Sequence, residues 1–314
     1  ETNIESILSH VQQKPPLALI IDSIQTLSSN AIPSSPGSIA QVRECARMLI
    51  SWAKMNRIPV FLSGHVTKEG DVAGPRILEH MVDVVLYMEG EALGGLRLVR
   101  SVKNRFGSSY EVAIFQMEQH GLCQVEDPSK VLLTQRRAAT VGSTVIPIME
   151  GSRPVLVEIQ ALTSPTYSPV PRRVVNGLDL TRVLMLIAIL DRRAGLSLAR
   201  QDIIVNVAGG IRVSEPAVDL GIALAVASSF VGLPLEDNMV VIGEVGLTGE
   251  IRLVPQTERR LKEASRLGLK NALVASDPNG KDQFGTDSKI RSVSTLRDAV
   301  NQAFPKHSRG QIKA

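Results

Sequence analysis

The first half of the chain alternates short apolar runs with segments in which apolar residues recur at helical spacing. Residues 17–21 (LALII) form a continuous apolar run, which is typical of a strand buried on both faces of a sheet. Residues 39–53 have the spacing of a helix, and residues 59–63 are predicted as the next strand. Residues 96–102 and 110–117 are expected to form a late antiparallel pair of strands. This alternation predicts an α/β fold class with a parallel sheet.

The second half opens with β-like runs and then alternates again. Its pattern predicts strands at 143–149, 154–162, 203–207, 239–242 and 271–275, and helices at 179–193, 215–230, 257–267 and 295–304. A polar connection between the halves marks a domain boundary. We therefore expect an α/β domain over residues 1–130, a linker over 131–140, an α+β domain over 141–306 and a frayed tail over 307–314.

Length and composition narrow the class of protein. A chain of 314 residues is long enough for two domains, and 44% hydrophobic with 21% charged residues is typical of a globular protein. No run approaches the ~20 apolar residues that cross a bilayer, and no secretory signal is visible, so we expect no membrane contact. Cys45 and Cys123 alone cannot form a disulfide framework or a zinc site, which favours a reducing compartment. Because the sequence begins without methionine, we expect an upstream part.

Charge changes this picture because the basic residues cluster. The chain has 35 Lys and Arg against 31 Asp and Glu, a net charge of +4. Two segments without acids, 92–110 and 128–149, hold Arg97, Arg100, Lys103, Arg105, Lys130, Arg136 and Arg137. Such segments are suited to contact a nucleic-acid phosphate backbone. Charge alone, however, favours an ordinary solvated surface.

The apolar run at 17–21 ends in Asp22, which is the Walker B pattern of nucleotide hydrolases. A carboxylate at the end of a buried strand lies where open α/β sheets bind ligands, and there Asp22 would hold Mg²⁺ through water beside ATP. A simple turn or helix cap is the alternative for such an acid. The partner motif G-x-x-x-x-G-K-[ST] is absent from the sequence. Either the chain is no nucleotide hydrolase, or the loop precedes Glu1.

Two downstream segments decide between these readings. Residues 64–83 (GHVTKEGDVAGPRILEHMVD) and 103–107 (KNRFG) resemble the RadA/Sms family of DNA repair proteins, relatives of the RecA recombinase. The resemblance covers the whole chain and implies a RecA-like ATPase domain, with ATP and Mg²⁺ as cofactors. It also implies that the Walker A loop and a four-cysteine zinc module lie upstream of Glu1.

The resemblance also implies roles for individual residues. Asp22 resembles the Walker B carboxylate, with Ser23 beside it at the nucleotide. His65 matches the polar γ-phosphate sensor of RecA-like proteins, although a histidine that caps a strand end is an equal alternative. Lys68 and Arg76 would contact DNA phosphates from a glycine-containing loop, for which a plain surface loop is the alternative.

Lys103 and Arg105, in the KNRFG motif, stand two residues apart, so on a strand both side chains leave the same face. That geometry suits two cations that reach a neighbouring subunit's nucleotide as arginine fingers do. In the family the motif is tied both to ATP turnover and to DNA engagement. Without the resemblance the segment would be a charged hairpin.

The second half resembles the proteolytic domain of Lon, through residues 218–229 (VDLGIALAVASS) and 243–274. Lon proteases use a serine and a lysine, but the matching positions hold Asp219 and Glu258. Two nearby carboxylates cannot form such a pair, so we expect no peptidase activity. Ser214 is expected to cap a helix, and Ser228 and Ser229 to pack in the core.

Three functions follow. The first is an ATP-driven motor of homologous recombination, which binds single-stranded and branched DNA as a hexamer and works with a RecA-type recombinase. We expect such a protein in the bacterial cytoplasm, or in a plant chloroplast or mitochondrion. The alternatives are a Lon-type protease and a non-catalytic scaffold. In the first case the Lon-like domain would bind DNA and hold the oligomer, through candidates among Arg172, Arg173, Arg192, Arg193, Arg259 and Arg260.

Overall fold

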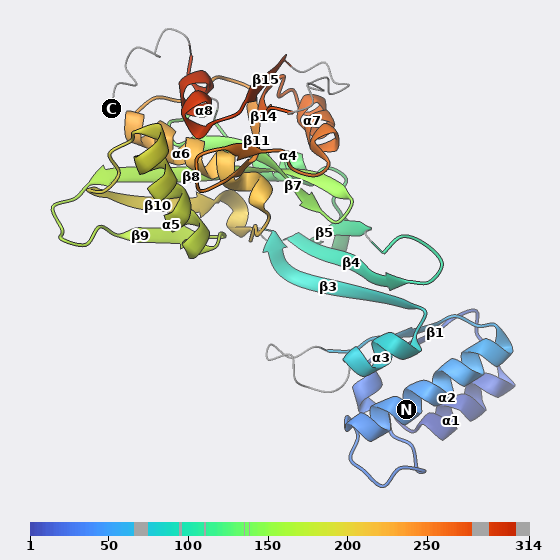
Figure 1. Cartoon of the computed structure of the whole chain (residues 1–314). Helices are drawn as coiled ribbons and strands as arrows, with labels where there is room; N and C mark the ends of the chain where they lie inside the picture. The colour runs from blue at the N-terminus through green and yellow to red at the C-terminus, as the bar shows by residue number, and fades with distance from the viewer. Residues whose placement is uncertain are drawn as a thin grey trace. The chain divides into compact units, whose positions relative to one another are not determined.

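The computed structural model describes residues 1–65, 75–93, 96–109, 111–134, 136–137, 139–277 and 289–305. The chain forms two compact units, drawn in Figure 1: one of residues 1–87 and 101–109, the other of residues 88–100 and 110–314. Within the described residues, every helix is too short or too polar to cross a membrane.

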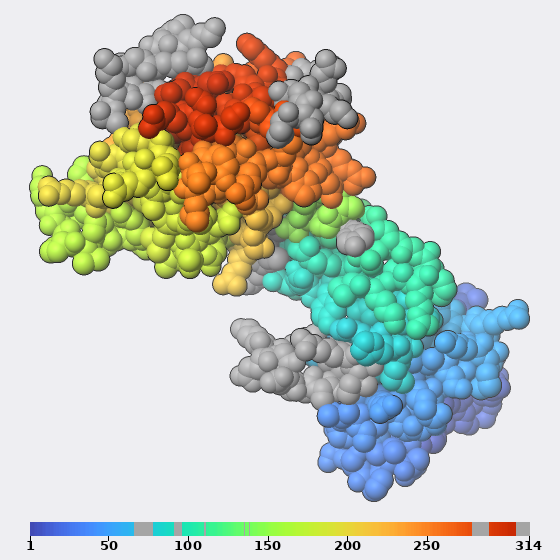
Figure 2. Space-filling view, in the orientation of Figure 1, coloured from blue at the N-terminus to red at the C-terminus, as the bar shows by residue number. Residues whose placement is uncertain are grey.

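The first unit contains two long helices and a short parallel sheet. Its elements are α1 (Ile4–Gln13), β1 (Leu19–Ile21), the 3₁₀ turn η1 (Ile24–Thr26), α2 (Ile39–Asn56), β2 (Val60–Leu62) and α3 (Pro75–Met81). Figure 2 shows the N-terminal part of this unit, in blue, as one continuous body. Asn3 and Ser38 begin the two helices, because each side chain accepts a hydrogen bond from a first-turn N–H.

The strands β1 and β2 pair in parallel, with Leu19 opposite Val60 and Ile21 opposite Leu62. The prediction of a strand buried on both faces is wrong for β1. Ile21 packs in a core with residues of α1 and α2, but Ile20, on the opposite face, is 73% exposed. The reason is that in the described residues the helices cover one face of this two-stranded sheet.

A four-stranded sheet follows, in the order β3-β4-β5-β6. Its strands are β3 (Val84–Leu93), β4 (Leu96–Asn104), β5 (Val112–Glu118) and β6 (Gly121–Gln124). Leu98 faces Ile114 in the antiparallel β4–β5 pair. The late antiparallel pair expected from the sequence is therefore confirmed.

The second unit is built on a seven-stranded mixed sheet of order β15-β14-β11-β7-β8-β10-β9. Its strands are β7 (Ser143–Glu150), β8 (Arg153–Pro165), β9 (Arg173–Asn176), β10 (Gln201–Val207), β11 (Met239–Ile242), β14 (Asn271–Ala275) and β15 (Lys289–Val293). A small hairpin pairs β12 (Glu244–Val245) with β13 (Ile251–Arg252). The helices and turns are α4 (Pro128–Leu133), α5 (Leu180–Ile189), the π-helical turn η2 (Leu190–Ala194), the 3₁₀ turns η3 (Ala208–Gly210) and η4 (Pro216–Val218), α6 (Asp219–Val231), α7 (Thr257–Arg266) and α8 (Leu296–Ala303).

Helices cover both faces of this sheet, which explains its continuous apolar strands. Ile146 and Val241 face a core shared with α5, α6 and α8, whereas their neighbours Val145 and Val240 face a second core with α7. Figure 1 shows α5, α6 and α8 gathered on one side. The α/β fold class, with a parallel pair in the first unit and an α+β unit after it, is confirmed. The domain boundary expected at 131–140 remains a prediction.

One predicted cap is wrong. The residue that precedes the turn η4 is Glu215, not Ser214, and α6 itself begins only at Asp219. Glu215 is held there because its carboxylate accepts the Met149 N–H at 2.8 Å and pairs with Arg260. The predicted core position is confirmed for Ser228, which is fully buried and donates to the Leu233 carbonyl at 2.6 Å. Ser229 is only partly buried, and its hydroxyl accepts a hydrogen bond from the Thr163 N–H at 2.8 Å.

Gly221 gives a test of the contact between α6 and the sheet. A Gly→Ala change inside a helix normally stabilises it by about 1 kcal/mol. Here the added Cβ would overlap the Cγ2 methyl of Ile146, so we expect Gly221→Ala to lower the free energy of unfolding by about 1–3 kcal/mol. Denaturant unfolding of this variant, of Ile146→Ala and of the double variant measures the effect. Costs that simply add in the double variant would contradict the overlap.

Candidate functional site

The carboxyl ends of β1 and β2 bring together the residues expected to bind nucleotide. Asp22 follows β1 directly and Ser63 follows β2, and the Ser63 hydroxyl donates to Asp22 Oδ1 at 2.5 Å. Backbone bonds fix both positions: Ser63 N–H donates to the Ile21 carbonyl and Ile24 N–H to the Ser63 carbonyl, each at 2.9 Å. The Asp22–Ser23 peptide bond is cis. Asp22 is exposed, whereas Ser23 is buried at the start of η1.

Gln25 and His65 lie at the same edge. Gln25 Nε2 donates to the His65 carbonyl at 3.3 Å. Gln25 Oε1 is buried and has no hydrogen-bond partner among the described residues. The Gly64 backbone approaches this amide, since a Cβ added there would lie 3.3 Å from Gln25 Nε2. The His65 side chain itself is exposed.

These residues fit a hydrated Mg²⁺ ion. Asp22 and Ser63 offer oxygen atoms, the donors that Mg²⁺ prefers, and the exposed Asp22 carboxylate leaves room for the several waters that Mg²⁺ usually keeps. An ion held there through water by Asp22 would neutralise charge on the β- and γ-phosphates of ATP. Ser63 would orient the carboxylate, because its hydroxyl occupies one oxygen of Asp22.

Lys103 and Arg105 are held by other parts of the first unit. The Lys103 ammonium donates to the carbonyls of Glu79 and Val82, at 2.6 and 2.8 Å, around the end of α3, where a cation is favoured by the helix dipole. Arg105 forms an ion pair with Asp83 at 3.1 Å, in which the Arg105 side chain is half exposed and the Asp83 side chain about one third exposed. Lys103 is the last but one residue of β4 and Arg105 follows the strand. Their role at a neighbouring subunit's nucleotide remains a prediction.

The residues predicted to contact DNA differ in the exposure and the hydrogen bonding of their side chains. Lys68 lies outside the described residues, and Arg76 belongs to α3 but its side chain lies outside the description. Arg172 is exposed. Arg173 donates to the carbonyls of Leu198 and Gln201, and burial lowers the pKa of its guanidinium. Arg172 is therefore the freer cation of the pair.

Two other basic residues form ion pairs with acids inside the fold. The interpretation of Arg260 as a DNA-facing residue is wrong, because it is 2% exposed and pairs with Glu215 at 2.6 Å. It also donates to the Pro147 carbonyl. Arg100, from the first acid-free segment, pairs with Glu89 and Glu150. Burial raises the pKa of the Glu150 carboxyl, while Arg100 opposes this rise. Ion pairs within the fold therefore neutralise the positive charges of Arg100 and Arg260.

The positions that match the Lon dyad carry separate ion pairs. Asp219, fully buried at the start of α6, accepts from Arg182 Nε at 2.8 Å and from Arg182 Nη2, and also from the Val245 N–H at 3.1 Å. Glu258, on α7, is exposed and pairs with Lys262 at 2.6 Å. Each carboxylate has its own cation. Burial raises the pKa of Asp219, while Arg182 and the Val245 N–H act in the opposite direction.

Sequence reasoning missed Ser63, Gln25 and Arg182. Ser63 could have been found, because two predicted parallel strands that end side by side bring their final residues together. Gln25 carries no such signal, since it lies in the turn η1. Arg182 stands 37 residues before its partner Asp219, and only the packing of α5 against α6 brings the two together.

The fold and the site together define an α/β protein with an acidic ligand site at the carboxyl ends of parallel strands. Comparison with known proteins narrows this class. The chain is 51% identical to DNA repair protein RadA of Bacillus subtilis over 94% of its length, and 48% identical to that of Halalkalibacterium halodurans over 96%. It is 47% identical to that of Pseudomonas aeruginosa over 97%. The chain belongs to the RadA family.

The chain covers only part of these relatives, and part of its second unit matches a family model. The chain spans 66% of the length of the Bacillus and Halalkalibacterium relatives and 67% of the Pseudomonas one. Residues 181–278, in the second unit, match a family described as subunit ChlI of Mg-chelatase. The matched segment includes Asp219 and Glu258.

The Arg182–Asp219 ion pair is expected to stabilise the second unit. Arg182→Ala leaves a fully buried carboxylate without its cation, which should lower the free energy of unfolding by about 3 kcal/mol. The matched control is Arg252→Ala, which breaks an exposed pair with Glu250 and should cost at most about 1 kcal/mol. Denaturant unfolding near neutral pH measures both. Equal small losses would contradict the assignment.

The same variant should depend on pH. Without Arg182, burial alone raises the pKa of Asp219, so the folded carboxyl binds its proton more tightly than the unfolded one, whose ordinary value is 3.8. Lowering the pH through the folded pKa then favours the folded state. The stability deficit of Arg182→Ala should therefore be smaller at about pH 5 than at about pH 8, and a deficit that grows on acidification would contradict this.

Proposed function

We propose that this chain is part of an ATP-dependent DNA motor of homologous recombination and repair. The observation that carries the proposal is the strand-end carboxylate Asp22, oriented by Ser63, in a member of the RadA family. The relatives are named DNA repair proteins. In the proposal the motor binds single-stranded DNA and promotes branch migration and strand exchange.

The first unit would supply the ATPase chemistry. Asp22 holds Mg²⁺ through water, and the exposed imidazole of His65, at the same edge of the sheet, donates to a γ-phosphate oxygen. Lys103 and Arg105 act on the nucleotide of a neighbouring subunit. An exposed ion pair such as Arg105–Asp83 is worth little, so Arg105 can exchange Asp83 for a phosphate at small cost.

The second unit would serve as a scaffold for DNA binding and for a hexamer, beside a RecA-type recombinase in the bacterial cytoplasm. Arg172 is the favoured DNA contact of this unit, because its side chain is exposed. Lys68 and Arg76 would add DNA contacts from the first half of the chain. In the proposal this unit has the Lon-like architecture that the sequence resemblance implies. Within it, residues 181–278 match the family described as subunit ChlI of Mg-chelatase.

A protease of Lon type is the second candidate, and the structure of Asp219 argues against it. A carboxylate that is fully buried and bonded to Arg182 and the Val245 N–H cannot attack a peptide. Ser228 offers no substitute nucleophile, because its hydroxyl is buried and bonded to the Leu233 carbonyl. A non-catalytic scaffold is the third candidate, and the ATPase measurements below separate it from the motor.

Asp22→Asn tests the ATPase site. The amide keeps the shape of the side chain but loses the charge that attracts the hydrated Mg²⁺, so ATP hydrolysis stimulated by single-stranded DNA should fall by about 100-fold or more. The assay uses the protein with the phosphate loop that the resemblance places before Glu1. Glu44→Gln, a partly buried acid of α2 paired with the exposed Arg47, is the control and should keep full turnover. Unchanged turnover in Asp22→Asn would refute the site.

Lys103→Gln, made in the same longer protein, tests the action between subunits. Glutamine carries no charge and is one atom shorter than lysine, so a finger role predicts a loss of about 10³-fold in turnover in a protein that still unfolds cooperatively. Mixing this variant with Asp22→Asn should restore activity in part, because one subunit then supplies Asp22 and its neighbour Lys103. A mixture of Asp22→Asn with the double variant should stay inactive. Failure of the first mixture, with both variants assembled, would contradict the proposal.

A further inference from the structure

The hairpin of β5 and β6 carries three potential metal ligands of three different kinds. Strand β5 ends at Glu118, β6 begins at Gly121, and Cys123 lies opposite Gln116. Because Glu118 and Gly121 are paired, Glu118 and Cys123 belong to the same face of the hairpin, one step apart along the diagonal. His120 stands in the two-residue loop between the strands, next to Gly121, whose φ is 118°.

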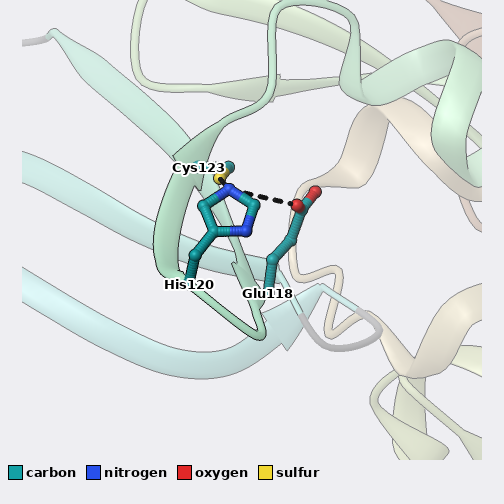
Figure 3. A group of neighbouring side chains, drawn as sticks. All are labelled: Glu118, His120 and Cys123. Carbon is teal, nitrogen blue, oxygen red and sulfur yellow. Dashed lines mark hydrogen bonds and ion pairs between the residues drawn. The ribbon is translucent and has the colours of Figure 1, made fainter.

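The three side chains converge, as Figure 3 shows. His120 Nε2 lies 3.2 Å from Cys123 Sγ and 3.6 Å from Glu118 Oε2. One ligand atom from each residue can be chosen so that all three lie within 4.8 Å of one another. This is the one such cluster of three found among the described residues.

These separations suit a common tetrahedral centre. Zinc lies about 2.3 Å from sulfur and about 2.0–2.2 Å from nitrogen and oxygen. Two ligands of one tetrahedron are then about 3.3–3.7 Å apart, close to both measured distances. The third edge, between Glu118 and Cys123, can close by small side-chain rotations, because the His120 side chain is 75% exposed and the Glu118 side chain 47%.

We propose that Glu118, His120 and Cys123 form a binding site for a thiophilic divalent metal ion, Zn²⁺ in the first place, with water as the fourth ligand. A thiolate and an imidazole favour Zn²⁺ over Mg²⁺ or Ca²⁺, which prefer oxygen alone. Binding would release the Cys123 thiol proton to solvent as the S–Zn bond forms. The site is distinct from the one at Asp22, and its donors come from six consecutive residues.

The site has a structural consequence for the sheet. β6 is the edge strand in the order β3-β4-β5-β6 and pairs with β5 alone. A metal ion bound at the tip of the β5–β6 hairpin would therefore hold β6 in register with β5. A ligand that binds the folded state alone stabilises it in proportion to the logarithm of its concentration. We therefore expect Zn²⁺ to raise the thermal unfolding temperature of the hairpin's unit.

The test uses Co²⁺ as a spectroscopic substitute for Zn²⁺ on the chain as it stands. One equivalent of Co²⁺ should produce a sulfur-to-cobalt charge-transfer band in the near ultraviolet, and Zn²⁺ should displace it. Cys123→Ser should abolish the band, and His120→Gln or Glu118→Gln should weaken metal binding by at least about 10-fold. Circular dichroism verifies that these surface variants keep the fold.

Two matched controls make the result specific. Cys45→Ala removes the other cysteine, which is fully buried in the first unit, and His10→Gln removes an exposed histidine of α1. Both should leave the band and the affinity unchanged. Absence of a band in the parent chain, persistence of the band in Cys123→Ser, or its loss in Cys45→Ala would each overturn the proposal.

Discussion

The parallel pairing of β1 with β2 is the constraint on which the candidate nucleotide site depends. Each strand contributes three residues, and because both run in the same direction their carboxyl ends meet at one edge. Asp22 and Ser63 are separated by 41 positions in the sequence, yet one hydrogen bond joins them. Without this register the carboxylate would be a surface acid with no defined direction. The pairing gives the carboxylate a defined direction.

The second unit shows how buried charge limits chemistry. Asp219 and Arg260 are each almost completely buried, and each is balanced by a partner from a different element, Arg182 and Glu215. A buried charge without its partner costs several kcal/mol, so these positions are committed to stability. Asp219, at the position that the resemblance aligns with the Lon nucleophile, joins α6 to Arg182 of α5.

Hydrogen-bond partners, rather than the number of cations, decide which basic residues remain available. Arg100, Arg173 and Arg260 are bound to acids or carbonyls within the fold. Arg105 and Arg172 remain exposed, and the exposed pair of Arg105 can be exchanged because solvent weakens it. The hairpin cluster adds a contrast: its cysteine could not make a zinc site with Cys45, but His120 and Glu118 offer the missing donors within the same turn.

The sequence by itself determined the periodic elements, the α/β class and the position of Asp22 at a strand end, because apolar spacing and strand-end acids are local properties. Through the resemblance to Lon, it also predicted that Asp219 and Glu258 stand where that family has a serine and a lysine. It did not determine that Ile20 is exposed, that Arg260 is buried or that Gln25 lies beside His65. Those facts depend on which surfaces meet in space, and pairs such as Arg182 with Asp219 leave no periodic signal along the chain. Tertiary packing alone decided them, because burial and charge pairing join residues far apart in the sequence.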